Sequence, residues 1–130
     1  MRVALDTNAY VALHRGDTSI HEVLRLSDFV GVPAVVLGEL CSGFRQGTRG
    51  PENKAQLARF LAKPSVQVLP ITAETALRYA EIDFYLRTRG RPIPRNDVWI
   101  GASAIEHGLH LLTLDHHFLD IPLLLVQPER

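Results

Sequence analysis

The stretch RNDVWIGASAIEHGLHLLTLD, residues 95–115, predicts a helix followed directly by a buried strand. Its first part places Val98, Ala102 and Ile105 at helical spacing, and Gly108 suits the position just after a helix C-terminus. The next part, LHLLT, is a short apolar run of the length of a buried strand. A helix that leads into a buried strand is the repeating unit of α/β folds with a parallel sheet.

The same alternation extends outward over the rest of the chain. The other expected strands are residues 2–5, 28–33, 66–70 and 122–126, and the other expected helices are residues 7–16, 19–27, 34–47, 53–64 and 73–90. Glycine and proline fall between these segments, and residues 47–52, GTRGPE, carry the strongest loop signal. The pattern predicts one α/β domain over residues 1–130 with a mostly parallel sheet.

Composition narrows the class of protein. The chain has 130 residues, 46% of them hydrophobic, which is enough for one folded core. Lys plus Arg and Asp plus Glu both number 14, so net charge gives no overall attraction to nucleic acid. The single cysteine, Cys41, excludes an internal disulfide and fits a reducing compartment. Because the chain also lacks a signal-peptide pattern and a membrane-length apolar run, we expect a cytoplasmic protein without membrane contact.

Four acidic residues occupy positions that the expected topology brings to one edge of the sheet. Ligands of open parallel sheets bind beyond the carboxyl ends of the strands. Asp6 follows the first strand, and Asp115 follows LHLLT by two residues. Asp97 lies in the first turn of its helix, and Glu39 lies in the helix after the second strand. Each has an ordinary structural explanation as a turn residue, a helix cap or a solvated helix face. Their convergence favours one shared site.

A cluster of carboxylates needs a cation, because like charges raise one another's pKa. Oxygen ligands suit Mg²⁺ or Mn²⁺, and such ions serve phosphate chemistry by activating water and stabilising the leaving oxygen. The residues therefore predict a metal-dependent phosphoryl-transfer or phosphodiester-cleaving site.

Three segments carry a resemblance to a known family: LDTN at residues 5–8, GEL at residues 38–40, and PIPRNDVWIGASAIEHGLHLLTLDHHF at residues 92–118. They resemble the PIN domain and, within it, the VapC-type toxin ribonucleases of toxin–antitoxin pairs. The resemblance implies a three-layer α/β/α fold and a Mg²⁺- or Mn²⁺-dependent endoribonuclease that leaves a 5′-phosphate. It places the family's acidic quartet on Asp6, Glu39, Asp97 and Asp115, with supporting polar residues at Thr7, Asn8 and Thr113.

The resemblance also implies partners, which are an RNA substrate, a small cognate antitoxin that covers the site, and a second copy of the chain in a homodimer. Two alternatives stay open. The chain could be a PIN-like module that only binds, although all four acids are present. It could also be a phosphoacceptor receiver domain. That fold requires an acidic pair after the first strand and a late lysine, whereas Asp6 is a lone acid and the only lysines are Lys54 and Lys63.

Other residues carry weaker expectations. The arginines that could form a basic rim for RNA phosphates are Arg45, Arg49, Arg87, Arg89, Arg91 and Arg95. They could instead bind the antitoxin or simply be solvated at a helix end. We expect Cys41 to be a core or boundary residue and Trp99 to pack in the core rather than stack on a base. Neither His116 nor His117 is expected to bind the metal, because Mg²⁺ prefers oxygen.

Overall fold

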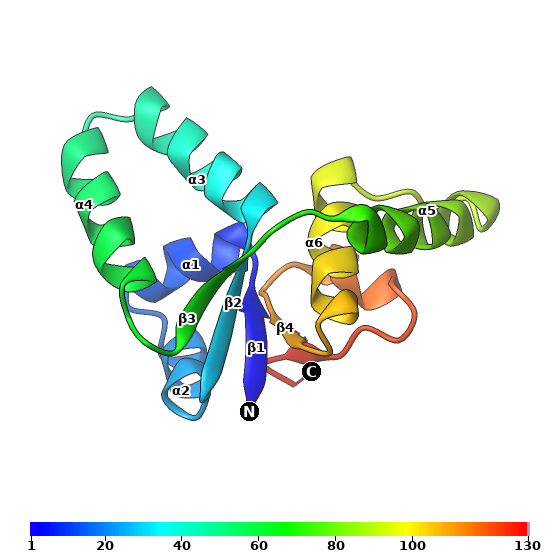
Figure 1. Cartoon of the computed structure of the whole chain (residues 1–130), viewed down its shortest axis with the longest axis horizontal. Coiled ribbons are helices and arrows are strands. Elements are labelled where there is room, and N and C mark those ends of the chain that lie inside the picture. The colour runs from blue at the N-terminus through cyan, green and yellow to red at the C-terminus, as the bar shows by residue number, and fades with distance from the viewer. Residues whose placement is uncertain (130) are drawn as a thin grey trace.

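The computed structural model describes residues 1–129 and contains a five-stranded sheet between layers of helices (Figure 1). The strands are β1 (Arg2–Leu5), β2 (Phe29–Pro33), β3 (Val66–Leu69), β4 (His110–Leu112) and β5 (Val126–Gln127). The helices are α1 (Thr7–His14), α2 (Thr18–Arg25), α3 (Ala34–Gln46), α4 (Gly50–Leu61), α5 (Ala73–Thr88), α6 (Arg95–Glu106) and the short 3₁₀ helix η1 (His116–Asp120). The predicted α/β class is confirmed.

All five strands are parallel, in the order β3-β2-β1-β4-β5. After β1, strands β2 and β3 are added in turn on one side of β1. The chain then crosses back, and β4 and β5 are added on the other side of β1. Because parallel crossovers are right-handed, this reversal puts α1, α3 and α4 on one face and α5 and α6 on the other (Figure 1). The carboxyl ends of β1 and β4 therefore form the switch point at which open α/β sheets bind ligands.

The central strands are buried on both faces, which explains their continuous apolar sequences. Val3, Ala4 and Leu5 of β1 and Leu111 and Leu112 of β4 are all fully buried. This rigid pair of strands fixes the direction in which the residues directly after them point.

One glycine in the sheet is required by close packing. A Cβ at Gly31 of β2 would lie 2.7 Å from Leu69 Cδ1 and 3.0 Å from Leu109 Cδ1. A larger residue there would push the side chains of β3 and of the segment before β4 out of place.

Two predicted boundaries are wrong. Helix α4 begins at Gly50, so part of the predicted loop over residues 47–52 is helical, with Pro51 in the first turn where no backbone donor is needed. The predicted last strand over residues 122–126 is mostly irregular, because only Val126 and Gln127 pair with β4.

The predicted burial of two side chains also differs from the structure. Cys41 is exposed, because it lies on the outward face of α3. Trp99 is half-buried rather than central, and its ring stacks on Tyr79 of α5 at a centroid distance of 4.2 Å. Among the helices described for residues 1–129, none is long and apolar enough to cross a membrane.

Candidate metal centre

Asp6 joins the end of β1 to the start of α1. Its Oδ1 accepts a hydrogen bond of 2.7 Å from the Ala9 amide, which makes it the N-cap of α1, and its Oδ2 accepts one from the Thr113 hydroxyl. The residue is only 3% exposed. Burial raises its pKa to about 6, the charges of Asp115 and Asp97 add to the rise, and the two hydrogen bonds oppose it.

Thr113 connects the acids that follow the two central strands. Its hydroxyl donates to Asp6 and accepts a hydrogen bond of 2.9 Å from the Asp115 amide. Asp115 then caps η1, because its Oδ1 accepts a hydrogen bond of 2.9 Å from the His117 amide. Pairing of β1 with β4 therefore fixes both carboxylates at one edge of the sheet.

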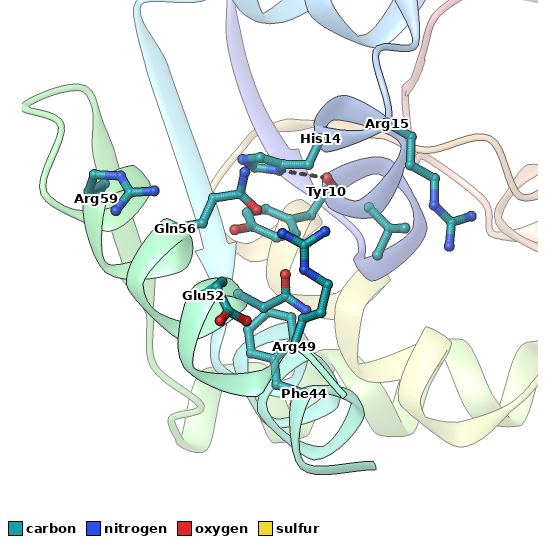
Figure 2. Close-up of a pocket in the computed structure, with 10 residues that line it drawn as sticks. Tyr10, His14, Arg15, Phe44, Arg49, Glu52, Gln56 and Arg59 are labelled. Atoms are coloured by element: carbon teal, nitrogen blue, oxygen red, sulfur yellow. Dashed lines mark hydrogen bonds between the residues drawn. The ribbon is translucent and has the colours of Figure 1, made fainter. Parts of the chain in front are cut away.

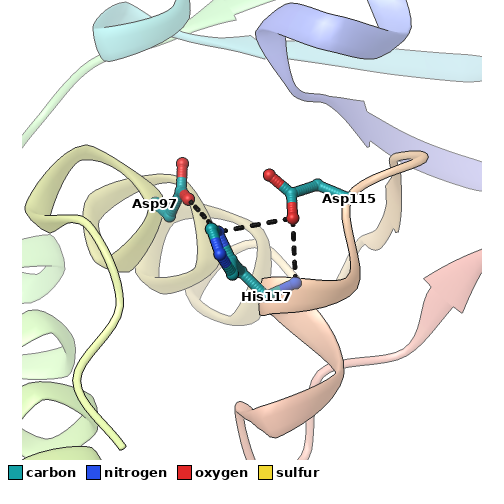
Figure 3. A group of neighbouring side chains, drawn as sticks. All are labelled: Asp97, Asp115 and His117. Atoms are coloured by element: carbon teal, nitrogen blue, oxygen red, sulfur yellow. Dashed lines mark hydrogen bonds and ion pairs between the residues drawn. The ribbon is translucent and has the colours of Figure 1, made fainter.

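Asp97 is the third residue of α6 and does not cap it. The N-cap is Pro94, and no side chain makes a capping hydrogen bond there. The Asp97 carboxylate instead points toward the end of β4, where His117 Nδ1 lies 3.3 Å from Asp97 Oδ2 and 3.3 Å from Asp115 Oδ1 (Figure 3). Partial burial raises the pKa of Asp97, and the hydrogen bond from His117 opposes that rise.

These contacts define a three-residue centre of Asp97, Asp115 and His117, whose ligand atoms all lie within 4.8 Å of one another. Two carboxylates at this separation repel each other unless a positive charge lies between them. Two carboxylate oxygens with space for water match the way divalent cations are held at phosphate-processing sites. The donor set therefore fits a divalent cation.

Glu39 stands beside this centre and is held from two sides. Thr7 of α1 donates a hydrogen bond of 2.5 Å to Oε1, and Asn96 of α6 donates one of 3.2 Å to Oε2. Its charge also contributes to the raised pKa of Asp97. All four predicted acids thus lie in one neighbourhood, but only two belong to the three-residue centre. Asn8 is exposed and lines a separate depression at the outer surface of α1.

Three of the six predicted arginines make contacts within the chain. Arg87 pairs with Asp83 at 2.9 Å, and the Arg91 guanidinium is 3.8 Å from Asp120. Arg89 lies 3.6 Å over the ring of Tyr85. The C-terminal end of α5, which Arg89 and Arg91 follow in the chain, lies at the edge of the molecule, away from the sheet (Figure 1). Arg95, at the start of α6, is exposed.

Arg49 occupies a different place, in a cleft of about 630 Å³ between α1, α3 and α4 (Figure 2). Arg15 and Arg59 line the same cleft, together with the aromatic rings of Tyr10 and Phe44 and one acid, Glu52. Arg45 lines a neighbouring pocket with Cys41 and Lys54. The basic side chains therefore form separate groups rather than one rim.

Asn96 was not predicted as a partner of Glu39, and His117 was not expected at the centre. Asn96 directly precedes Asp97 in the sequence, which is the only local signal for it. The orientation of His117 depends on η1, the short helix that Asp115 caps, and no sequence pattern indicates that helix.

Comparisons with known proteins show the family and the fold. A family model described as PIN domain matches residues 3–124. Two ribonucleases of Mycobacterium tuberculosis are similar. VapC4 is 34% identical over 93 residues, with 71% of each chain covered, and VapC5 is 29% identical over 114 residues, with 88% of this chain and 83% of that protein covered. In a crystal structure of VapBC2 from Rickettsia felis bound to a promoter DNA fragment, a chain with 27% identity superposes with a TM-score of 0.87 over 98% of both chains.

Proposed function

The chain belongs to the PIN domain family, and on that basis we propose that it is an endoribonuclease and the toxin of a toxin–antitoxin pair. The observation that carries the proposal is the convergence of acids at the switch point of the sheet, with Asp97 and Asp115 facing each other across His117. The similarity to ribonucleases VapC4 and VapC5 supports RNA as the substrate.

A divalent cation, Mg²⁺ or Mn²⁺, is the cofactor in this proposal, held by Asp97 and Asp115 with Asp6 and Glu39 nearby. When bound, it would supply positive charge for the phosphate oxygens and increase the acidity of a water molecule. Hydrolysis then joins the water oxygen to phosphorus and breaks the bond to the 3′-oxygen, which leaves a 5′-phosphate.

The chain's own residues organise this site before substrate arrives. Thr113 and the Ala9 amide hold the two oxygens of Asp6, so its orientation is fixed. Thr7 and Asn96 likewise hold Glu39. These hydrogen bonds hold the carboxylates of Asp6 and Glu39 beside the three-residue centre and in fixed orientations, which leaves space at the centre for a cation and a phosphate.

Partners follow from the same similarity. The Rickettsia felis structure contains VapBC2 bound to promoter DNA. By similarity, we propose that this chain also has a cognate antitoxin. A homodimer and a cytoplasmic location belong to the proposal as well. Of the candidate RNA-binding arginines, Arg49 has the surroundings that best suit a phosphate, because two further arginines line its cleft.

A cleavage assay on single-stranded RNA tests the proposal, with wild type, Asp97→Asn and the control Asp83→Asn, which removes an acid paired with Arg87 on α5. We expect wild type and Asp83→Asn to cleave with Mg²⁺ or Mn²⁺ and to stop in EDTA. Asp97→Asn should fold normally and lose activity by at least about 10–100-fold, the usual cost of disturbing a metal site. Adding the antitoxin should stop wild-type cleavage.

Two results would contradict this function. Cleavage that continues unchanged in EDTA would exclude the metal centre. RNA binding without any cleavage by the folded wild-type chain would instead support the alternative of a PIN-like binding module.

A further inference from the structure

His117 is the least expected member of the three-residue centre. Its side chain is 53% exposed, yet its Nδ1 lies between the carboxylates of Asp97 and Asp115 (Figure 3). The backbone fixes this placement, because the His117 amide donates a hydrogen bond to Asp115, the N-cap of η1. The imidazole ring of His117 therefore reaches the centre from a short helix that Asp115 itself caps.

The distances match those between neighbouring ligands of a single ion. Two ligand atoms about 2.1 Å from an octahedral ion and at right angles to each other are about 3 Å apart. His117 Nδ1 is 3.3 Å from one oxygen of Asp97 and 3.3 Å from one oxygen of Asp115. A cation could therefore contact all three atoms with small movements of the side chains.

The nature of the ligand then determines the preferred ion. Mg²⁺ favours oxygen ligands and water, whereas an imidazole nitrogen suits the later first-row transition metals such as iron, nickel and zinc. Mn²⁺ also suits oxygen ligands but, as a transition-metal ion, accepts an imidazole nitrogen more readily than Mg²⁺ does. We propose that His117 Nδ1 is a ligand of the divalent cation and that it makes the centre prefer a transition-metal dication to Mg²⁺. This inference rests on the proposed function, because it concerns the metal of that same site.

A competing explanation has the same geometry without a metal bond. His117 could donate a hydrogen bond from Nδ1 to Asp97 and only orient that carboxylate. Loss of the imidazole ring would then weaken the binding of every cation to a similar extent. A true nitrogen ligand, in contrast, changes the ratio of affinities for two cations, which separates the two explanations.

The test uses Mn²⁺ and Mg²⁺ as probes with the full chain, and compares wild type, His117→Ala and His116→Ala. His116 is the exposed neighbour in the same turn and lies outside the three-residue centre, so it is the matched control. Calorimetry gives the ratio of the Mg²⁺ and Mn²⁺ dissociation constants, and pulsed EPR of the Mn²⁺-loaded protein detects coupling to an imidazole nitrogen. Thermal unfolding confirms that each variant folds.

We expect nitrogen coupling in wild type and His116→Ala and none in His117→Ala. The preference for Mn²⁺ should fall by about 10-fold or more in His117→Ala alone. Mn²⁺ that binds wild type without nitrogen coupling, or an equal loss of affinity for both ions in His117→Ala, would overturn the role of His117 and leave the proposed function intact. Failure of wild type to bind either ion would overturn the metal centre itself.

Discussion

Asp6 shows how a single buried carboxylate links stability to function. Its pKa is about 6 in the folded chain against an ordinary value of 3.8, so the folded state favours the protonated form. Ionisation of Asp6 therefore lowers the free energy of unfolding. This loss is absent below about pH 4, grows between about pH 4 and 6, and is complete above about pH 6. A difference of this size corresponds to about 3 kcal/mol at neutral pH. A cation near the site would offset part of it.

We therefore predict that Asp6→Asn stabilises the metal-free protein, by an amount that increases as the pH rises from 4 to 7. Asn can still accept from the Ala9 amide, so the N-cap of α1 survives the change. The expected gain at pH 7 is at most about 3 kcal/mol, because the Thr113 hydrogen bond is altered as well. Urea unfolding in EDTA at several pH values measures it.

Asp17 provides the matched control, because it caps α2 at the surface and its hydrogen bonds from Ser19 and Ile20 lower its pKa. The folded state there favours the charged form. The stability of Asp17→Asn relative to wild type should therefore fall as the pH rises through the acidic range in which Asp17 titrates, and should stay constant above about pH 4. Equal pH trends for the two variants would refute the role assigned to the burial of Asp6.

At the scale of elements, three helices present their first residues to the centre. Asp6 caps α1, Asp97 lies in the first turn of α6, and Asp115 caps η1. The N-terminal ends of helices carry partial positive charge, which favours carboxylates there. The same placement that stabilises each helix thus gathers negative charge at the edge of the sheet.

Glycines within and after helices allow a direct test of the element boundaries. Gly108 follows α6 with φ of +65°, a conformation that costs an alanine about 1 kcal/mol. Gly43 lies inside α3, and a Cβ there would meet nothing within 4 Å. We predict that Gly108→Ala destabilises the protein by about 1 kcal/mol and that Gly43→Ala stabilises it by up to about 1 kcal/mol. Thermal or urea unfolding of both variants measures the effect, and a shift of the same sign in both would contradict it.

The sequence predicts buried elements better than boundaries that depend on distant contacts. Strand β1 runs over residues 2–5, as its apolar run indicates, and Gly108 ends α6 as expected. The start of α4 was missed because Gly50 and Pro51 signal a loop in isolation, although proline is compatible with a first helical turn. Strand β5 was overextended because an apolar run alone cannot show which residues find a partner strand.

The site residues also divide into those that the sequence predicts and those that depend on distant contacts. The alternation of strands and helices, with Asp6 and Asp115 placed after strands, predicts that the acids lie near each other. The inward direction of Asp97 required the family resemblance, because its place in a first turn fits capping equally well. His117 and Asn96 could not be assigned, since their contacts with acids depend on η1 and on the packing of α3 beside α6.

Over the whole molecule, zero net charge conceals a separation of charges. The four acids of the site gather at the carboxyl ends of β1 and β4, whereas the cleft between α1, α3 and α4 is lined by Arg15, Arg49 and Arg59 with one acid, Glu52 (Figure 2). Helix α1 connects the two regions, because Asp6 caps its first turn and its residue Tyr10 lines the cleft. An RNA strand bound at the acids could therefore continue along α1 toward these arginines.

The last prediction compares Arg49→Ala with Arg87→Ala, which differ in what the arginine already contacts. Arg87 is paired with Asp83 on the exposed side of α5, whereas Arg49 shares its cleft with two further arginines. If Arg49 binds an RNA phosphate, Arg49→Ala should weaken binding to all sequences alike and flatten its salt dependence by about 0.7 log unit. Arg87→Ala should leave both unchanged. The measurement is the affinity for single-stranded RNA in EDTA at several salt concentrations.

Antitoxin affinity, measured in parallel on the same two variants, separates RNA from protein as the occupant of the cleft. Arg49→Ala that binds RNA normally but loses antitoxin would assign the cleft to the partner, because a single missing guanidinium would then act only on that complex. A flattened salt slope in Arg87→Ala alone would move the RNA path to the end of α5, where the guanidinium would have to leave Asp83 for a phosphate. That exchange requires little energy, since exposed ion pairs contribute at most about 1 kcal/mol, so the salt slope rather than the existing contact decides between the two paths.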